Sequence, residues 1–264
     1  MSLGLLGIKL GMTHAYDPYG RRRAVTVIRL GPCTILDIRD PKKHGYRAVQ
    51  VGFEPIQEKK QNKAQLGQFK KAGAGPFRYV REFRLRNLNN GQPAAKDAKT
   101  QLEPEFKVGQ ELKADLFQQF ELVDVAGISI GKGFQGGMKR WNWRGGNETH
   151  GSMSHRAPGS IGSTTTPGRV WKGHHLPGHM GMERVTIQSL RVSKVDLENN
   201  LLLVEGAIPG AENALVLVSK SVKRPGFLKK PQEIQTVFED DEGLSKTAKA
   251  ASKKLKQPTA AAKA

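Results

Sequence analysis

A stretch of 55 residues near the middle of the chain, residues 127–181, most constrains what this sequence can fold into. It holds 14 of the 30 glycines, all three tryptophans and five of the seven histidines. It also holds seven Lys or Arg residues and a single acidic residue, Glu148. Almost nothing in it can form a conventional hydrophobic core, so another molecule must order it. The excess of positive charge indicates that this partner is an anion.

The whole chain shares this positive charge. Its formal net charge is +19, its pI is about 10.1, and hydrophobic residues make up 37% of its 264 residues. Such a surplus opposes compact folding through self-repulsion unless a polyanion neutralises it, and nucleic acid is the expected polyanion. An anionic membrane is the alternative, but no apolar run approaches the roughly 20 residues that span a bilayer. No basic amphipathic helix of the membrane-surface kind stands out either.

The chain's one cysteine, Cys33, excludes a disulfide scaffold or a multi-cysteine zinc site within the chain. A single cysteine fits a reducing compartment. The N-terminal sequence MSLGLLGIKLGMTHAYD lacks an apolar core of secretory length, so no signal peptide is expected. The sequence therefore predicts a cytoplasmic protein.

Short β-branched or alternating runs, separated by Gly, Pro and Asn, predict strands on both sides of the central segment. This spacing is typical of an antiparallel barrel or sandwich, so the expected fold is mainly β. Residues 56–74 predict a helix interrupted at Gly67, and residues 88–112 a polar loop or small insert. The predicted strands are residues 24–30, 34–38, 48–53, 78–85, 185–195, 201–204 and 214–218.

The simplest organisation is one β domain with a long excursion that becomes ordered on a partner. A structureless loop of about 50 residues would otherwise count against the assignment. The Ala/Lys-rich end of the chain cannot bury a core and is expected to be disordered. The expected parts are a β-barrel domain of residues 1–126 and 182–222 with a helical or loop insert near 56–112, an arm of residues 127–181, and a C-terminal tail of residues 223–264.

Two kinds of chemistry can be weighed against the residues of the central segment. Imidazole binds zinc, copper and nickel, but the five histidines share one carboxylate, no cysteine and no standard zinc spacing. We therefore expect no metal site, and histidines that contact phosphates or bases instead. The sequence GISIGKG resembles a phosphate-binding loop, but it is one residue short and Gly133 stands where Ser or Thr is needed.

Catalysis finds little support in the same segment. Serines lie near the histidines, but there is no GxSxG elbow and no pair of acidic residues. We expect no enzymatic activity, no cofactor and no small-molecule substrate.

The tryptophans of the segment alternate with Arg and Lys, as expected for stacking on unpaired bases and contact with phosphates. Local packing of at least one tryptophan is the alternative. The residues predicted to bind RNA are Lys132, Lys139, Arg140, Trp141, Trp143, Arg144, His150, His155, Arg156, Arg169, Trp171, Lys172, His174 and His175.

Several long motifs in this chain, agreeing in order, resemble one known family. They are GLLGIKLGMTHAYDPYGRRRAVTVI, NKAQLGQFKKAG, KGFQGGMKRWNWRGG, THGSMSHRAPGSIGSTTTPGRVWKGHHLPGHMG and ERVTIQSLRV. Together they resemble the bacterial form of the ribosomal protein L-three family of the large subunit, from about residue 3 to residue 222.

This resemblance implies a translation-protein-type β-barrel with a largely irregular RNA-binding extension. It implies direct binding to 23S-type rRNA, support of early subunit assembly, neighbouring large-subunit proteins as partners, and an extension that points towards the peptidyl transferase centre. By the same resemblance, Trp171 lies on the stem of the extension. The residues implied near its tip are Ser160, Ile161, Gly162, Ser163 and Thr164.

Two other classes of protein stay open from the residues alone. A general nucleic-acid-binding protein outside the ribosome would explain the charge and the tail. A metalloenzyme that uses the histidines would explain their number.

One position departs from the family pattern and gives a test. Many bacterial members carry, directly after GSIG, a glutamine that is methylated on its side-chain amide, and this chain has Ser163 there. The side chain of serine has no amide nitrogen, so we expect no such modification. Peptide mass spectra of the protein from native ribosomes should show residues 159–169 without amide methylation; a methylated amide within that peptide would contradict the prediction.

Overall fold

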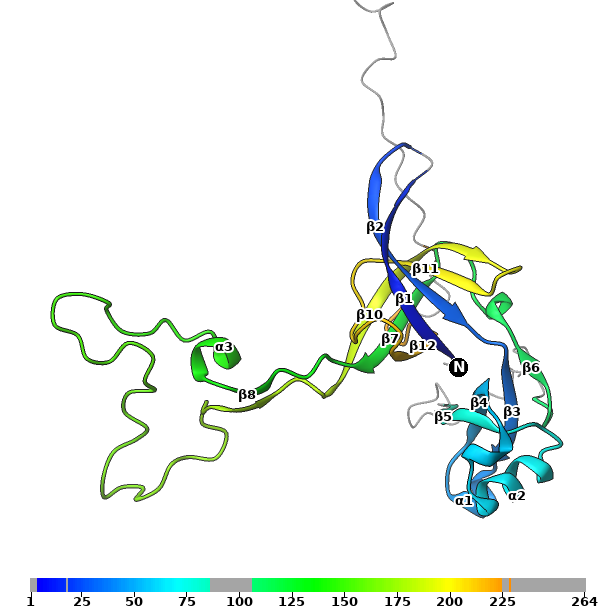
Figure 1. Ribbon diagram of the computed structural model, residues 1–264, viewed down its shortest axis with the longest axis horizontal. Helices are drawn as coiled ribbons and strands as arrows, with labels where there is room; N and C mark the ends of the chain where they lie inside the picture. Colours follow the sequence, from blue (N-terminus) through cyan, green and yellow to red (C-terminus); the bar gives the residue numbers. More distant parts are fainter. Residues whose placement is uncertain (1–3, 18, 86–105, 225–227, 229–264) are drawn as a thin grey trace, which may run out of the picture.

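The computed structural model describes residues 4–17, 19–85, 106–224 and 228 of the chain. Figure 1 shows a β body from which a long arm extends to one side. The body contains a closed barrel and a second, four-stranded sheet. Most of the predicted insert at 88–112 and nearly all of the predicted C-terminal tail lie outside the described residues.

The barrel has six strands in the order β1-β12-β7-β10-β11-β2, and all neighbours are antiparallel. The mainly β, antiparallel barrel expected from the sequence is therefore confirmed. The first strand pairs with the last, with Gly4 opposite Ser219. The strands are β1 (Gly4–Tyr16), β2 (Arg22–Leu30), β7 (Leu122–Ile128), β10 (Arg184–Asp196), β11 (Leu201–Glu205) and β12 (Leu215–Lys220).

Two barrel strands, β1 and β7, have no counterpart among the predicted strands. The first five residues of β1 and the first six of β7 are all buried, so neither start shows the alternation that marks a half-buried strand. Glycine also lowers strand propensity, and β1 needs it for close packing. A Cβ on Gly4 would lie 2.4 Å from the carbonyl oxygen of Val218 on the paired strand.

The second sheet has the order β5-β4-β3-β6 and packs on the barrel. Its strands are β3 (Cys33–Arg39), β4 (Ala48–Pro55), β5 (Phe77–Arg84) and β6 (Glu111–Leu112). The sequence predicted β3, β4 and β5 as strands but did not separate this sheet from the barrel. Val49, Val51 and Phe53 join barrel residues such as Leu6 and Leu202 in one continuous core. The cysteine Cys33 belongs to this core, where burial raises the pKa of its thiol to about 12 and keeps it protonated.

Short helices flank the second sheet. They are α1 (Pro41–His44), the 3₁₀ helix η1 (Glu58–Lys60) and α2 (Lys63–Lys71), while the 3₁₀ helix η2 (Ala114–Leu116) follows β6 and lies against the barrel strand β10. The predicted interruption at Gly67 is wrong, because α2 continues through this residue. One glycine costs a helix only about 1 kcal/mol, and burial of Phe69 against Phe77, with ring centroids 6.0 Å apart, offsets that cost.

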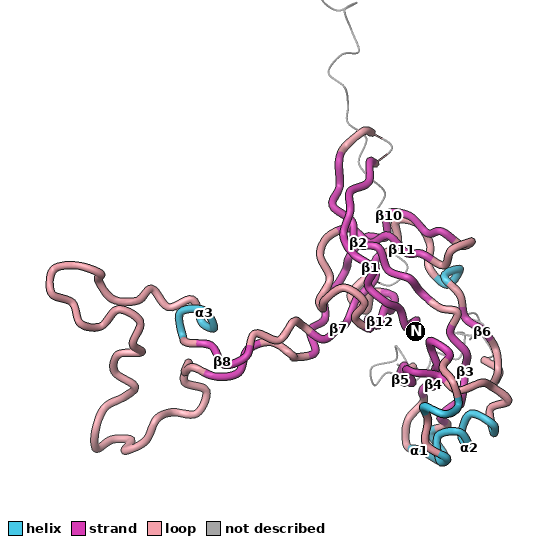
Figure 2. Tube along the Cα trace, in the orientation of Figure 1, coloured by secondary structure: helices cyan, strands magenta, loops and turns pink. Residues whose placement is uncertain are grey.

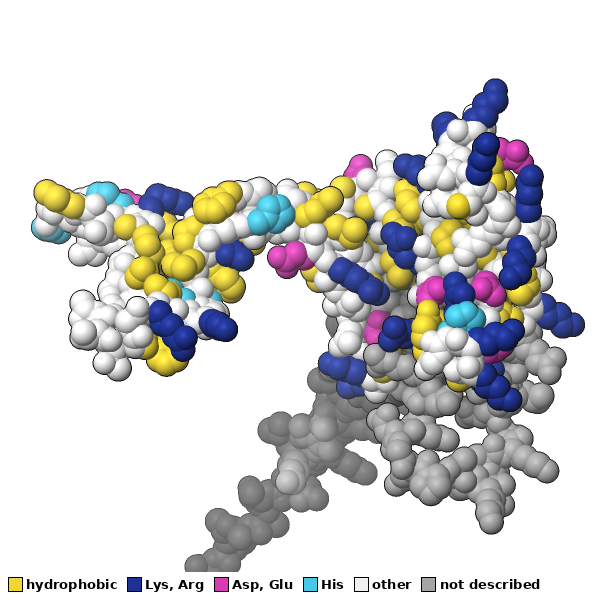
Figure 3. Space-filling model, turned by 90° about the horizontal axis from the view of Figure 1, so that it is seen from below, with side chains coloured by type: hydrophobic (Ala, Val, Ile, Leu, Met, Phe, Trp, Pro, Cys, Tyr) yellow, Lys and Arg dark blue, Asp and Glu magenta, His cyan; other side chains and the backbone are white. Residues whose placement is uncertain are grey.

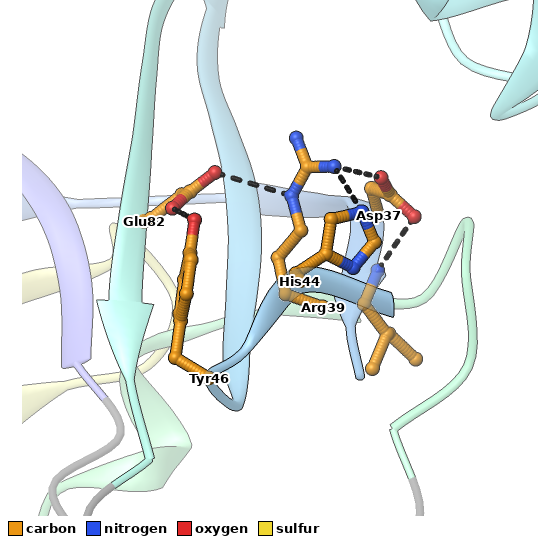
Figure 4. Close-up of polar contacts among 6 residues, drawn as sticks. Asp37, Arg39, His44, Tyr46 and Glu82 are labelled. Carbon is orange, nitrogen blue, oxygen red and sulfur yellow. Dashed lines mark hydrogen bonds and ion pairs between the residues drawn. The ribbon is translucent and has the colours of Figure 1, made fainter. Parts of the chain in front are cut away.

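A polar cluster fixes the loop around α1 to this sheet (Figure 4). The guanidinium of Arg39 lies 3.3 Å from Glu82 and 3.2 Å from Asp37, and its Nη1 lies 3.1 Å from Nε2 of His44. The hydroxyl of Tyr46 donates to the other oxygen of Glu82 at 2.9 Å, which raises the pKa of Tyr46. Exposed ion pairs contribute little to stability, so the cluster positions the loop rather than stabilising the fold.

Buried Asp124 holds β7 to both of its barrel neighbours. One carboxylate oxygen accepts the N–H of Ser189 at 2.8 Å, at a bulge in β10 where Ser189 has φ 59°. The other accepts the N–H of Val222 at 3.1 Å, just after β12. A buried carboxylate is stable only when its oxygens have such partners, and here one side chain ties three strands together.

Replacing Asp124 by alanine should destabilise the barrel. The Asp124→Ala variant leaves two backbone N–H groups without their charged acceptor, so we expect its free energy of unfolding to fall by about 2–4 kcal/mol. Urea denaturation of the purified protein measures this loss.

Asp196→Ala is the matched control, because Asp196 also accepts backbone N–H groups, from Glu198 and Asn199, but is only partly buried, at the β10–β11 turn. Its hydrogen bond from the Asn199 side chain lowers the pKa of the Asp196 carboxyl, so its contribution is present near neutral pH and is lost as the solution becomes acidic. An equal loss of stability in the two variants at neutral pH would show that burial of Asp124 is not the cause.

Candidate nucleic-acid interface

The arm, residues 127–181, leaves the barrel from β7 and returns into β10, two strands that pair with each other (Figures 1 and 2). At its root Gly127 lies opposite Val185, and Ile128 opposite Arg184. The pairing continues outwards, with Lys132 N–H donating to the carbonyl of Met180 at 2.9 Å. It ends in a short two-stranded sheet of β8 (Gly133–Gln135) and β9 (Gly178–Met180). We call this paired part of the arm the stem; Trp171, which the resemblance implies on the stem of the extension, lies outside it.

The stem holds its two chains so close that glycine is required. Gly181 has φ +78°, a left-handed conformation that side chains disfavour. A Cβ there would lie 2.2 Å from the carbonyl oxygen of Ile130 on the facing chain. Main-chain contact, rather than side-chain packing, therefore sets the width of the stem.

Beyond β8 the chain forms a single turn of helix, α3 (Gly137–Trp141), which fixes the returning chain. The indole N–H of Trp141 and the guanidinium of Arg140 both donate to the carbonyl of Leu176, at 2.9 and 2.8 Å. The ring of Trp141 stacks on His175 with centroids 4.1 Å apart and planes 9° apart. These three predicted RNA-binding residues therefore also hold the arm together.

Trp143 shows the local packing that the sequence left as an alternative. Its ring lies against Gly137 so closely that a Cβ on this glycine would be 2.1 Å from the ring. Trp171 differs, because its side chain is 62% exposed and the Arg169 guanidinium carbon lies 5.8 Å from its ring centroid. Trp171 is thus the tryptophan of the arm that offers most of its surface to a partner.

Two segments of main chain, around Gly146 and His155, also meet in the outer part of the arm. The N–H of Gly146 donates to the carbonyl of His155 at 3.0 Å, and Nδ1 of His155 lies 2.8 Å from the carbonyl of Asn147. A Cβ on Gly146 would lie 1.8 Å from the carbonyl oxygen of Ser154. As in the stem, glycine permits a backbone crossing that no other residue would fit.

The loop implied near the arm's tip is exposed at every position from Ser160 to Thr164. Its hydroxyls bond within the loop: Ser160 Oγ donates to the carbonyl of Gly162 at 3.2 Å, and Ser163 Oγ to that of Thr166 at 2.6 Å. The hydroxyl of Ser163 thus serves the loop's own conformation.

The cations and histidines of the arm lie on its surface, as Figure 3 shows for one face. Arg140 and Trp143 are partly buried, and the other predicted RNA-binding residues are exposed. The exposed ones are Lys132, Lys139, Trp141, Arg144, His150, His155, Arg156, Arg169, Trp171, Lys172, His174 and His175.

A cleft of about 350 Å³ opens where the stem meets α3, and sequence reasoning missed part of its lining. Lys132, Arg140 and Trp141 line it as predicted residues. Ser129 and Glu183 line it too, and nothing in their sequence context marked them, because their position depends on the pairing of the two stem chains.

Within the described part of the chain, no three His, Cys, Asp or Glu side chains come together in an arrangement that could hold a metal ion. Separately, none of the helices that the structure describes is both long and apolar enough to cross a membrane.

These observations define a class: a small antiparallel barrel that holds a long, cationic, glycine-rich arm away from its body on two paired strands. A model of the family described as "Ribosomal protein L3" matches residues 87–200. The protein called large ribosomal subunit protein uL3 from Geotalea daltonii is 47% identical over 223 residues, covering 84% of this chain and 99% of that protein. The proteins of the same name from Brevibacillus brevis (48%; 85% of this chain, 100% of the relative) and Brachyspira hyodysenteriae (45%; 84% and 95%) are equally similar. The chain belongs to the ribosomal protein L3 family.

The crossing at Gly146 gives a test of how the arm is built. Gly146→Ala places a methyl group against the Ser154 carbonyl, so we expect the arm to lose this crossing and a tagged variant to enter large ribosomal subunits less well than wild type. The fraction of tagged protein that co-sediments with large subunits measures this.

The matched control is Gly136→Ala, because a Cβ on Gly136 meets nothing within 4 Å and its φ is −68°. Equal incorporation of the Gly146 and Gly136 variants would contradict the idea that the close crossing matters.

Proposed function

We propose that this protein is a structural component of the large ribosomal subunit that binds 23S-type rRNA directly. In this proposal the arm enters folded rRNA, the tip loop lies towards the peptidyl transferase centre, and the protein supports early assembly of the subunit without catalysing a reaction. Its partners are large-subunit rRNA and neighbouring large-subunit proteins, in the cytoplasm.

One observation carries the proposal: the arm has a surplus of positive charge and no hydrophobic core. The arm contains seven Lys and Arg residues and one acidic residue, which leaves a formal surplus of six positive charges. A surface of this kind is neutralised by phosphates, and each phosphate contact releases counterions from the RNA. The main-chain crossings give the arm its path, and its exposed side chains are left for a partner.

The chemistry of the exposed residues fits RNA rather than another anion. The exposed ring of Trp171, with Arg169 beside it, suits stacking on an unpaired base and contact with its phosphate. Arg and Lys at intervals along the arm suit a phosphate backbone. Folded rRNA supplies unpaired bases, 2′-hydroxyls and closely spaced phosphates together.

The names of the relatives support the ribosomal setting. Each of the proteins compared above is called a large ribosomal subunit protein, and this chain matches nearly their whole length. A general nucleic-acid-binding protein would share the charge but not these relatives, and a metalloenzyme is favoured by no arrangement of the described residues.

Sucrose-gradient fractionation of a cell lysate tests the setting. The protein should be present in stoichiometric amount in the large-subunit fraction, and a mainly free pool would argue against the proposal.

Binding of the purified protein to transcribed large-subunit rRNA tests the RNA contact. The logarithm of its affinity should fall with the logarithm of the salt concentration, with a slope of roughly 0.7–0.9 per phosphate contact. Trp171→Ala should weaken that binding by about fivefold or more, since loss of one stacked base costs roughly 1–3 kcal/mol.

A further inference from the structure

The hairpin of β1 and β2 continues well past the barrel. Strand β12 pairs with β1 only at residues 4–8, and β11 pairs with β2 only at residues 25–29. The two strands nevertheless stay paired as far as Tyr16 opposite Arg22. The paired residues 11–16 and 22–24, with residues 17 and 19–21 at the turn, therefore form a two-stranded ribbon that projects from the body in a different direction from the arm (Figures 1 and 2). We call them the ribbon.

The two faces of the ribbon differ. Ala15 and Arg23, opposite each other, are partly buried, and Arg23 lines a cleft of about 300 Å³ with the barrel residues Arg191 and Glu205. Asp17 pairs with Arg23 at 3.2 Å on this side. This face of the ribbon is thus turned towards the barrel across the cleft, which Tyr16 at the end of β1 lines as well.

The other face is solvent-exposed along its length. It carries Met12, His14 and Tyr16 on β1, with Arg22 opposite Tyr16 on β2. Met12 is 51% exposed and Tyr16 66%. The rings of His14 and Tyr16 stand edge to face, with centroids 5.8 Å apart and planes at 90°. Tyr16 keeps most of its surface exposed beside this contact.

An exposed two-stranded ribbon is only marginally stable by itself, and large apolar side chains on such a surface mark an interaction site. The charge of the ribbon selects the partner. It carries three consecutive arginines, Arg21, Arg22 and Arg23, against one acidic residue, Asp17. Aromatic rings beside arginine are suited to bases and phosphates, whereas a protein partner would have to supply acidic groups.

We infer that the exposed face of the ribbon is a second RNA-binding surface, in which an unpaired base stacks on Tyr16 and a neighbouring phosphate contacts Arg22. This inference rests on the proposed function, because it takes large-subunit rRNA as the RNA. With the arm it gives the protein two contacts that leave the barrel in different directions, so that one chain holds two separate parts of the RNA.

Photo-crosslinking in the intact particle tests the partner. Tyr16→p-benzoylphenylalanine, introduced in cells, should cross-link to rRNA in purified large subunits. Leu197→p-benzoylphenylalanine is the matched control, since Leu197 is 59% exposed on another turn of the barrel, between the acidic residues Asp196 and Glu198. A cross-link from position 16 to a protein, no cross-link, or RNA cross-linking no stronger than from position 197 would each overturn the inference.

Binding of the purified full-length protein to transcribed large-subunit rRNA tests the residues. Tyr16→Ala should weaken the affinity for this rRNA by about fivefold or more. Arg22→Ala should reduce the slope of log affinity against log salt concentration by about 0.7–0.9, because one phosphate contact is lost. Lys107→Ala removes an exposed charge far from the ribbon in sequence. It should change the affinity and the salt slope less than the two ribbon variants do.

The outcomes separate this inference from the proposed function. Weakened binding by the two ribbon variants, together with normal unfolding curves, supports the ribbon surface. If wild type binds and Trp171→Ala weakens binding but the ribbon variants do not, the ribbon surface is wrong and the arm stands. If wild type does not bind the rRNA at all, both proposals fail.

Discussion

The pairing of β7 with β10 is the constraint on which the rest of the molecule depends. It closes one side of the barrel, and its last pairs place the two ends of the arm beside each other. A loop of 55 residues would lose considerable entropy if its ends had to be brought together by the loop itself. Here the barrel's own hydrogen bonds and core hold them, so the arm can be composed for its partner rather than for its own stability.

Within the arm, main chain replaces side chain as the packing element. Gly181 and Gly146 each lie where a Cβ would overlap a carbonyl oxygen of the facing segment. Close approach of backbones leaves no interior to fill with aliphatic residues. It also leaves most of the charged side chains of the arm, and Trp171, on the surface. A segment whose composition indicates no core can therefore follow a defined path in the structure.

Sequence patterns predicted β4, where Val49, Val51 and Phe53 alternate with Gln50 and Gly52 in the sequence, and β11, where burial alternates in the structure as well. They missed β1 and β7, which begin GLLGI and LVDVA without a regular alternation of apolar and polar residues. They also could not separate the barrel from the second sheet, because alternation reports that a face is buried and not what covers it. In the arm, composition predicted exposure and charge correctly, but the use of Trp141 and Trp143 in local packing depends on contacts with residues such as Leu176 and Gly137, which no spacing reveals.

The pairing of the first strand with the last has a consequence for synthesis. Strand β1 cannot pair with β12 until residues 215–220 have been synthesised. Strand β7 cannot pair with either of its neighbours, β10 and β12, before the arm has been synthesised. At about 5–20 residues per second, the chain spends roughly 5–20 s between the end of β7 and the end of β12. During that interval the cationic arm has emerged while the barrel that anchors it is still open. Because of this strand order, the nascent chain can bind polyanions through its cationic arm before the barrel has folded. This gives a physical reason for another molecule to shield the arm until β12 has paired.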